Sequence, residues 1–219
     1  MSSSTVCRKS LCWTPSPINS TVQVDVACLA GDCFFACLSV WLNIYFGQTL
    51  FDPFKLRMCL AAALSWTEAA CATERVRDDL CNFEGLERNA PLSEVQSLVM
   101  KSSTWADHPI MSVMALFCTR LIGRRFGFLV IQVFETESRQ AKTHIFYAKP
   151  PVEQGETDPE LELACVLHLF RNEHYLLLAD SRTKRTIFDV PNEKWLASTS
   201  DEEDVGSEEN EISRDDQEL

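Results

Sequence analysis

The sequence has several absences that narrow the classes of protein to which it can belong. None of its apolar runs approaches the roughly 20 residues of a membrane-spanning helix, so we predict no membrane span. Residues 1–7 lack the apolar core of a signal peptide, so we expect a cytoplasmic protein. The chain also has no glycine-rich phosphate-binding loop and no internal repeat. Secreted, membrane-spanning and nucleotide-binding classes are therefore disfavoured.

Positive charge is also scarce, and the negative charge is concentrated at one end. Residues 197–219 hold ten acids and one arginine, which accounts for nine units of the net charge of −12. Because this segment is also poor in apolar residues, we predict an acidic disordered tail over 193–219. The remaining chain is nearly neutral, and its basic triplet of Arg120, Arg124 and Arg125 is too small to bind nucleic acid.

Cysteine is the exception to this scarcity, with ten residues scattered along the chain. Several lie on apolar faces of predicted helices, which indicates buried reduced thiols in a reducing compartment rather than a disulfide scaffold. The nearest approach to zinc-ligand spacing is Cys28, Cys33 and Cys37, but these residues lie partly on one core helix. We therefore predict no metal and no cofactor.

The pattern of the chain changes from helical to β-rich near residue 123. We predict a flexible N-terminal segment over 1–22 and one domain over 23–192. The order of helices followed by strands is typical of the α+β class, here a helical lobe packed on a mostly antiparallel β-sheet. The predicted helices are 33–46, 53–66, 67–82, 92–103 and 108–122; the predicted strands are 22–26, 126–134, 144–148, 163–170, 174–179 and 186–190.

The segment 29–47 carries the first candidate for chemistry. Apolar residues recur at helical spacing from Phe34 to Phe46, and Gly47 is a natural stop. Cys33 therefore lies in the first turn of a core helix, where backbone N–H groups favour negative charge and suit a nucleophilic thiolate or an oxyanion. The alternative is that Cys33 is one more small buried residue among the ten cysteines.

A cysteine nucleophile needs a base, and the chain has four histidines. His108 lies beside a helix cap, where a local or surface role is expected. His144 begins a strand and His168 lies inside one, so both are interpreted as structural. His174 follows a polar turn and begins an apolar strand, so its ring can stand at the rim of a sheet as a general base. The alternative is a hairpin histidine without a catalytic role.

Three motifs together resemble those of the ovarian-tumour (OTU) cysteine proteases. They are Gly31-Asp-Cys-Phe-Phe35, the Trp105–Leu116 stretch that opens a helix, and Asn172-Glu-His-Tyr-Leu176. They occur in the family's order within about residues 25–190. The resemblance implies a papain-like, OTU-like fold and a thiol protease that cleaves ubiquitin or ubiquitin-like protein conjugates. The residues in these motifs are more similar to those of viral members of the family than to those of the well-known cellular members. Viral members would act in the host cytoplasm.

The resemblance also implies roles for individual residues. Cys33 would attack the carbonyl after the modifier's C-terminal Gly-Gly, and His174 would take the thiol proton and later return one to the leaving lysine amine. The backbone N–H of Cys33, with those of the Ala30–Asp32 turn, would hold the oxyanion. Gly31 suits a narrow channel, because a Cβ there would crowd a substrate backbone.

The sequence departs from the family's pattern at two positions. Ala30 stands where the family often has Asp, and Leu176 where it often has a polar residue that orients the histidine. Asn172 and Asp180 are the candidates for the orienting role, and a bare dyad is also open. Two alternative functions follow: an inactive OTU-fold module that binds ubiquitin or another partner, and a cysteine hydrolase or interaction domain outside ubiquitin chemistry.

Overall fold

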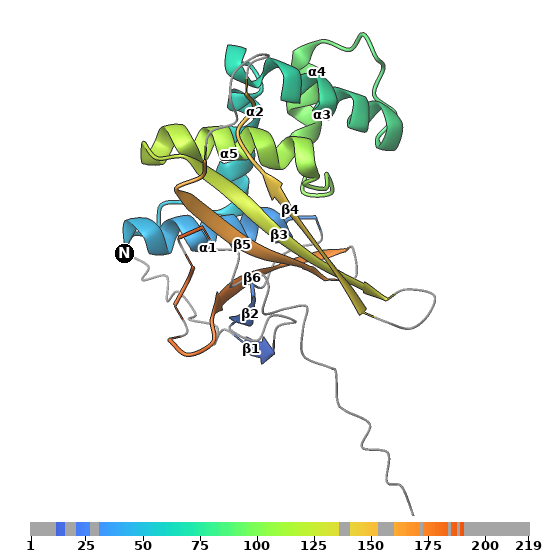
Figure 1. Ribbon diagram of the computed structural model, residues 1–219. Coiled ribbons are helices and arrows are strands. Elements are labelled where there is room, and N and C mark those ends of the chain that lie inside the picture. The colour runs from blue at the N-terminus through green and yellow to red at the C-terminus, as the bar shows by residue number, and fades with distance from the viewer. Residues whose placement is uncertain are drawn as a thin grey trace, which may run out of the picture.

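A computed structural model describes residues 12–15, 21–26, 31–135, 141–152, 160–170, 173–183, 185–187 and 189–190. Within these ranges the helices lie between two N-terminal and four C-terminal strands (Figure 1). The elements are β1 Cys12–Pro15, β2 Thr21–Asp25, α1 Cys33–Phe46, α2 Pro53–Ala63, the 3₁₀ helix η1 Thr67–Ala69, α3 Ala70–Phe83, α4 Leu92–Val99, α5 His108–Ile122, β3 Phe126–Glu135, β4 Ala141–Ala148, β5 Leu163–Phe170 and β6 His174–Asp180.

The strands form one sheet in the order β1-β2-β6-β5-β3-β4. Among the strands of the described residues, β3 and β5 pair in parallel and the other neighbours are antiparallel. The predicted α+β class with a mostly antiparallel sheet is therefore confirmed. Strand β4 pairs with one edge of β3, and β5 pairs with the opposite edge, where it runs parallel to β3.

Four predicted segments differ from the structure. The helix predicted over 53–66 ends at Ala63, and the one predicted over 92–103 ends at Val99. Residues 12–15, which we placed in the flexible N-terminal segment, form the edge strand β1, since their backbone pairs with β2. The strand predicted over 186–190 is replaced by two isolated bridges, in which Thr186 pairs with Ala179 and Asp189 with Leu163. The predicted tail over 193–219 lies outside the described residues.

The helical lobe covers one face of the sheet. Helix α1 packs on β6 and α5 on β3, while α2, α3 and α4 pack mainly on other helices (Figure 1). The large core lies between this lobe and the sheet and contains Trp41, Phe34 and Phe128. A much smaller cluster lies on the opposite face, formed by Leu129, Ile131, Val166 and Leu178. The sheet therefore has its main support, and its deepest burial, on the side of α1.

Local capping explains where the main helices begin and end. The Asp52 carboxylate accepts from the Lys55 N–H at the start of α2, and Asp107 does the same for Ile110 at the start of α5. Gly47 and Gly123 end α1 and α5 in the left-handed conformation. These predicted boundaries are confirmed. No helix in the described ranges is long and apolar enough to span a membrane.

Candidate active site

Cys33 is the first residue of α1 and is buried, with 3% of its surface exposed. The two residues that follow it, Phe34 and Phe35, have no exposed surface and anchor this helix end in the core. The ring of Phe34 contacts those of Phe35, Phe128 and Tyr175 at centroid distances of 5.1, 4.9 and 5.9 Å. The position of the thiol is therefore fixed by the packing of its neighbours, and it lies where the unpaired N–H groups of the first turn are directed.

Tyr175 brings the three sequence motifs together. Its backbone carbonyl accepts a hydrogen bond from Cys37 Sγ at 3.4 Å, one turn after Cys33. Its hydroxyl donates to the Ala106 carbonyl at 3.1 Å, and its ring lies 5.6 Å from that of Trp105. The start of β6, the first turns of α1 and the segment before α5 therefore meet at one buried side chain.

His174 directly precedes Tyr175 and is the first residue of β6, opposite Phe170 of β5. Its side chain is half-buried. Since successive side chains of a strand alternate between its faces, the ring of His174 leaves the strand on the side opposite to Tyr175. His174 begins β6, as the sequence predicted, and its pairing with the Cys33 thiol stays a prediction.

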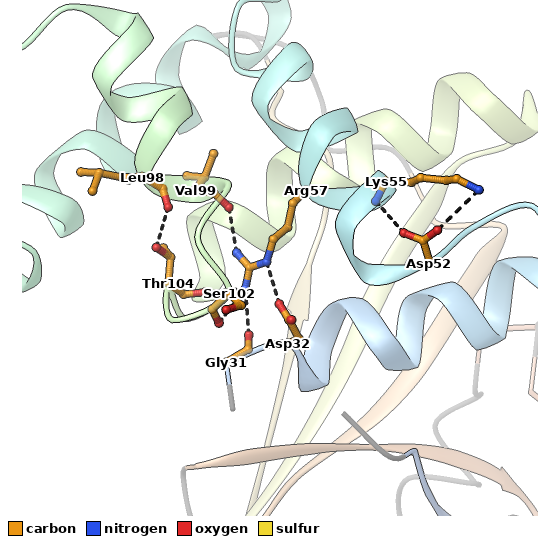
Figure 2. A network of polar contacts seen from close by, with 9 residues as sticks. All are labelled: Gly31, Asp32, Asp52, Lys55, Arg57, Leu98, Val99, Ser102 and Thr104. Carbon is orange, nitrogen blue, oxygen red and sulfur yellow. Dashed lines mark hydrogen bonds and ion pairs between the residues drawn. The ribbon is translucent and has the colours of Figure 1, made fainter. Parts of the chain in front are cut away.

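Arg57 organises the chain just before Cys33. It projects from α2, is only 2% exposed, and its guanidinium stacks over the Phe35 ring at 4.3 Å. Figure 2 shows it between the Gly31–Asp32 segment and the loop that follows α4. The guanidinium donates to Asp32 Oδ1 at 2.7 Å and to the carbonyls of Val99 (2.8 Å), Gly31 (3.0 Å), Thr104 (3.0 Å) and Ser102 (3.2 Å).

The charge of Arg57 is compensated within this network. Burial lowers the pKa of the guanidinium, while its hydrogen bond and charge interaction with Asp32, and the nearby Cys33, act in the opposite direction. An arginine so placed remains a cation, because its pKa starts far above neutrality. The ion pair with Arg57 therefore fixes Asp32, the residue that precedes Cys33.

Gly31 is required by the same network rather than by a substrate channel. Its φ is +85°, and a Cβ added there would lie 1.9 Å from the carbonyl oxygen of Ser102. Our sequence interpretation placed substrate backbone in that space, but the structure fills it with the loop after α4. The close approach of the two segments allows Arg57 to bind both.

The remaining predicted site residues have different outcomes. Asp180 lies at the other end of β6, roughly 20 Å from His174. Its carboxylate instead accepts from the backbone of Arg182 and Thr183, so Asp180 as the orienting residue is wrong. Ala30 and Asn172 lie outside the described residues. Asp32 lies next to Cys33 as expected, with its carboxylate held by Arg57, and its part in an oxyanion hole stays a prediction.

The other histidines have local partners. His168 is 4% exposed, and its Nδ1 lies 2.9 Å from Gln23 Nε2. Burial lowers the pKa of His168, which favours a neutral structural ring. His108 is exposed, with Nε2 3.2 Å from the Tyr147 carbonyl. Neither competes with His174 for the role of base. In the described ranges no group of three or more His, Cys, Asp or Glu side chains could hold a metal ion, and Cys28 lies outside them.

Sequence reasoning did not identify the roles of Arg57 and Tyr175. The position of Arg57 between Leu56 and Met58, in a mostly apolar helix, was the available signal for a buried cation. Nothing in the sequence indicated the five hydrogen-bond acceptors of Arg57, which lie 25 to 47 residues away along the chain. Tyr175 was part of the quoted motif, but its contacts depend on the packing of three distant segments.

Comparison with known proteins finds similar folds among solved structures. The chain is similar to an OTU deubiquitinase from Wolbachia pipientis wMel bound to ubiquitin (15% identity, TM-score 0.49, 75% of this chain and 98% of that chain). It is similar to the OTU domain of OTUD1 (16%, 0.43, 73% and 86%) and to the viral OTU protease of Qalyub virus (13%, 0.36, 78% and 99%). All three are OTU domains, the family that the three motifs resemble. No protein-family model and no curated protein matches the chain.

Proposed function

We propose that this chain is a thiol protease that removes ubiquitin or a ubiquitin-like modifier from proteins, with Cys33 as nucleophile and His174 as base. The observation that carries the proposal is the junction at Tyr175. It packs the strand end that bears His174 against the helix that begins at Cys33. A thiol at a helix N-terminus beside a histidine at a strand end is the arrangement that cysteine hydrolases use. The sequence motifs support ubiquitin as the modifier.

The proposed reaction has two steps. In the first, Cys33 Sγ forms a bond to the carbonyl carbon after the modifier's Gly-Gly, while its proton passes to the imidazole of His174. The tetrahedral oxyanion accepts from the N–H of Cys33 and from the preceding turn. The C–N bond then breaks as His174 gives the proton to the lysine amine, leaving a thioester. In the second step, water loses a proton to His174 and attacks the thioester, which releases the modifier and returns the proton to the thiol.

We propose Asn172 as the residue that orients His174. Asp180 is too distant for this role, and Leu176, two residues after His174, is apolar and 8% exposed, so its side chain cannot accept from the imidazole. A weaker orienting group leaves the imidazole in the productive tautomer for less of the time, which lowers the rate. The apolar Leu176 is also the observation that favours the second candidate function, a module of the same fold that binds ubiquitin without cleaving it.

Ubiquitin with a C-terminal thiol-reactive group tests the proposal directly. We expect a covalent adduct with the native chain, none with Cys33→Ala, and a much slower one with His174→Ala. Cys71→Ala is the matched control, because Cys71 is an exposed free thiol outside the three motifs, and it should leave the adduct unchanged. Binding of plain ubiquitin without an adduct would favour the inactive module. If the folded chain neither reacts nor binds, the ubiquitin proposal is wrong.

The proposed setting of this activity is a reducing compartment such as the cytoplasm. Seven cysteines of the described residues are free thiols. Four of them, Cys33, Cys37, Cys118 and Cys165, are buried. A nucleophilic thiol among so many reduced neighbours is most readily maintained where glutathione and thioredoxin act.

A further inference from the structure

A cavity of about 390 Å³ lies between α3 and the start of α5. Its walls are mostly apolar and include Leu80, Trp105 and Ile110. Phe83, also part of the lining, exposes 82% of its surface, the largest fraction among the large hydrophobic side chains of the described residues. The volume lies in the range of small-molecule sites, which combine apolar walls with a few placed polar groups.

The charged side chains that line this cavity are all negative. Asp79 and Glu84 come from α3 and its C-terminal end, and Asp107 is the N-cap of α5. All the charged side chains among the described lining residues are these acids. The Asp79 and Asp107 carboxyls, which come from two different helices, therefore line the same mostly apolar cavity.

Ionising the Asp107 carboxyl in this cavity, beside Asp79, has a free-energy cost. Burial, and then the neighbouring Asp79, raise the pKa of Asp107 to about 7, against the opposing bond from the Ile110 N–H. At neutral pH the Asp107 carboxyl therefore holds a proton in a large fraction of molecules. A bound cation would replace that proton and leave both carboxylates ionised and paired.

We propose that this cavity binds a small organic cation with an aromatic body, of the arylalkylamine class. The ammonium group would lie between Asp79 and Asp107, and the aromatic body would lie on Leu80 and Ile110. The Trp105 ring offers the cation an additional favourable surface. Phe83 would close the rim, which gives its exposed ring a function that the remaining structure does not supply. Neither Cys33 nor His174 lines the cavity, and the proposed binding does not depend on the proposed protease activity.

The experiment compares 2-phenylethylamine with 2-phenylethanol, which has the same body without the charge. Both are titrated into the full chain at pH 7 and followed by calorimetry and by the NMR signals of Trp105 and Phe83. We expect the amine to bind at least about tenfold more tightly than the alcohol, as is typical of a charge-assisted contact. We also expect protons to be released to the buffer when it binds. Equal affinities, or no perturbation of Trp105 by either compound, would overturn the proposal.

Three variants locate the binding. The double variant Asp79→Asn/Asp107→Asn should remove the preference for the amine and the proton release, while an asparagine at the N-cap can still cap α5. Asp78→Asn, an exposed neighbour on α3 that does not line the cavity, should change neither. Phe83→Ser removes an exposed ring and should weaken the binding of both compounds about equally. This variant tests the location of the site even if the double variant does not fold. If the amine binds the double variant and the native chain equally well, the acids are not its site and the proposal is wrong.

Discussion

Arg57 Nε lies 2.7 Å from Asp32 Oδ1, one residue before Cys33, with both side chains almost completely buried. An ion pair in this environment is a weak source of net stability, but losing one partner leaves an unpaired buried charge. Since the same guanidinium also holds four backbone carbonyls, the Arg57–Asp32 pair joins α1, α2 and the loop before Trp105 into one rigid unit. The candidate nucleophile is positioned by this unit.

Arg57→Met should destabilise the protein by about 3–5 kcal/mol, because Asp32 loses its counter-charge in the interior. Chemical denaturation measures this difference in the free energy of unfolding. Lys55→Met is the control, since its ion pair with Asp52 is about half exposed and should contribute at most about 1 kcal/mol. Similar losses in the two variants would contradict the role assigned to Arg57.

Gly31→Ala should be among the most disruptive small substitutions in the chain. The added methyl group would meet the Ser102 carbonyl oxygen at 1.9 Å, and the positive φ adds strain. Gly85→Ala provides a matched comparison, because its φ is +71° and nothing lies within 4 Å of the added Cβ. We expect Gly85→Ala to cost about 1 kcal/mol from backbone strain alone. Gly31→Ala should cost at least about 2 kcal/mol more and slow the ubiquitin adduct. Equal midpoints of unfolding for Gly31→Ala and Gly85→Ala would show that the loop carrying Ser102 moves away from the added methyl group freely.

Tyr175→Phe separates the hydroxyl from the ring. The substitution keeps the contacts with Phe34 and Trp105 but leaves the buried Ala106 carbonyl without its donor, at a cost of about 1–3 kcal/mol. We expect a folded protein whose ubiquitin adduct forms more slowly than in the native chain yet still depends on Cys33. Tyr147→Phe serves as the control, because its ring packs against the small cluster on the other face of the sheet. An adduct rate unaffected by Tyr175→Phe would mean that this hydrogen bond does not support the site.

The Asp107 carboxyl predicts a specific dependence of stability on pH. Its pKa is about 7 in the folded protein and near 3.8 when unperturbed, so between these values the native state binds more protons than the unfolded chain. The contribution of this group to stability therefore falls as pH rises from about 4 to 7 and stays low above 7. The acids that face it are Asp79 and Glu84 across the cavity.

Asp107→Asn removes this dependence while it retains a capping side chain. Relative to the native chain, the variant should gain about 2 kcal/mol of unfolding free energy between pH 5 and pH 8. Thermal or urea unfolding at the two pH values measures the gain. Asp52→Asn, at the exposed N-cap of α2, should show almost none. A pH-independent difference for Asp107→Asn would contradict the raised pKa.

Local chemistry in the sequence determined much of the secondary structure. Asp52 and Asp107 marked the starts of two helices, and Gly47 and Gly123 marked the ends of two, because capping acts within a few residues of the chain. The same locality placed Cys33 at the start of α1, and the apolar run over 163–170 matched β5 residue for residue.

Only the tertiary structure decided which distant residues meet. The tertiary structure joins segments separated by tens of residues at four places: the five partners of Arg57, the Ser102 oxygen beside Gly31, the convergence of three motifs on Tyr175, and the cavity lined by both Asp79 and Asp107. Such contacts depend on the order of strands in the sheet and on how the helices pack over it. Periodicity and capping specify single elements and leave that arrangement open, because the free energy that selects it comes from burying the whole core at once.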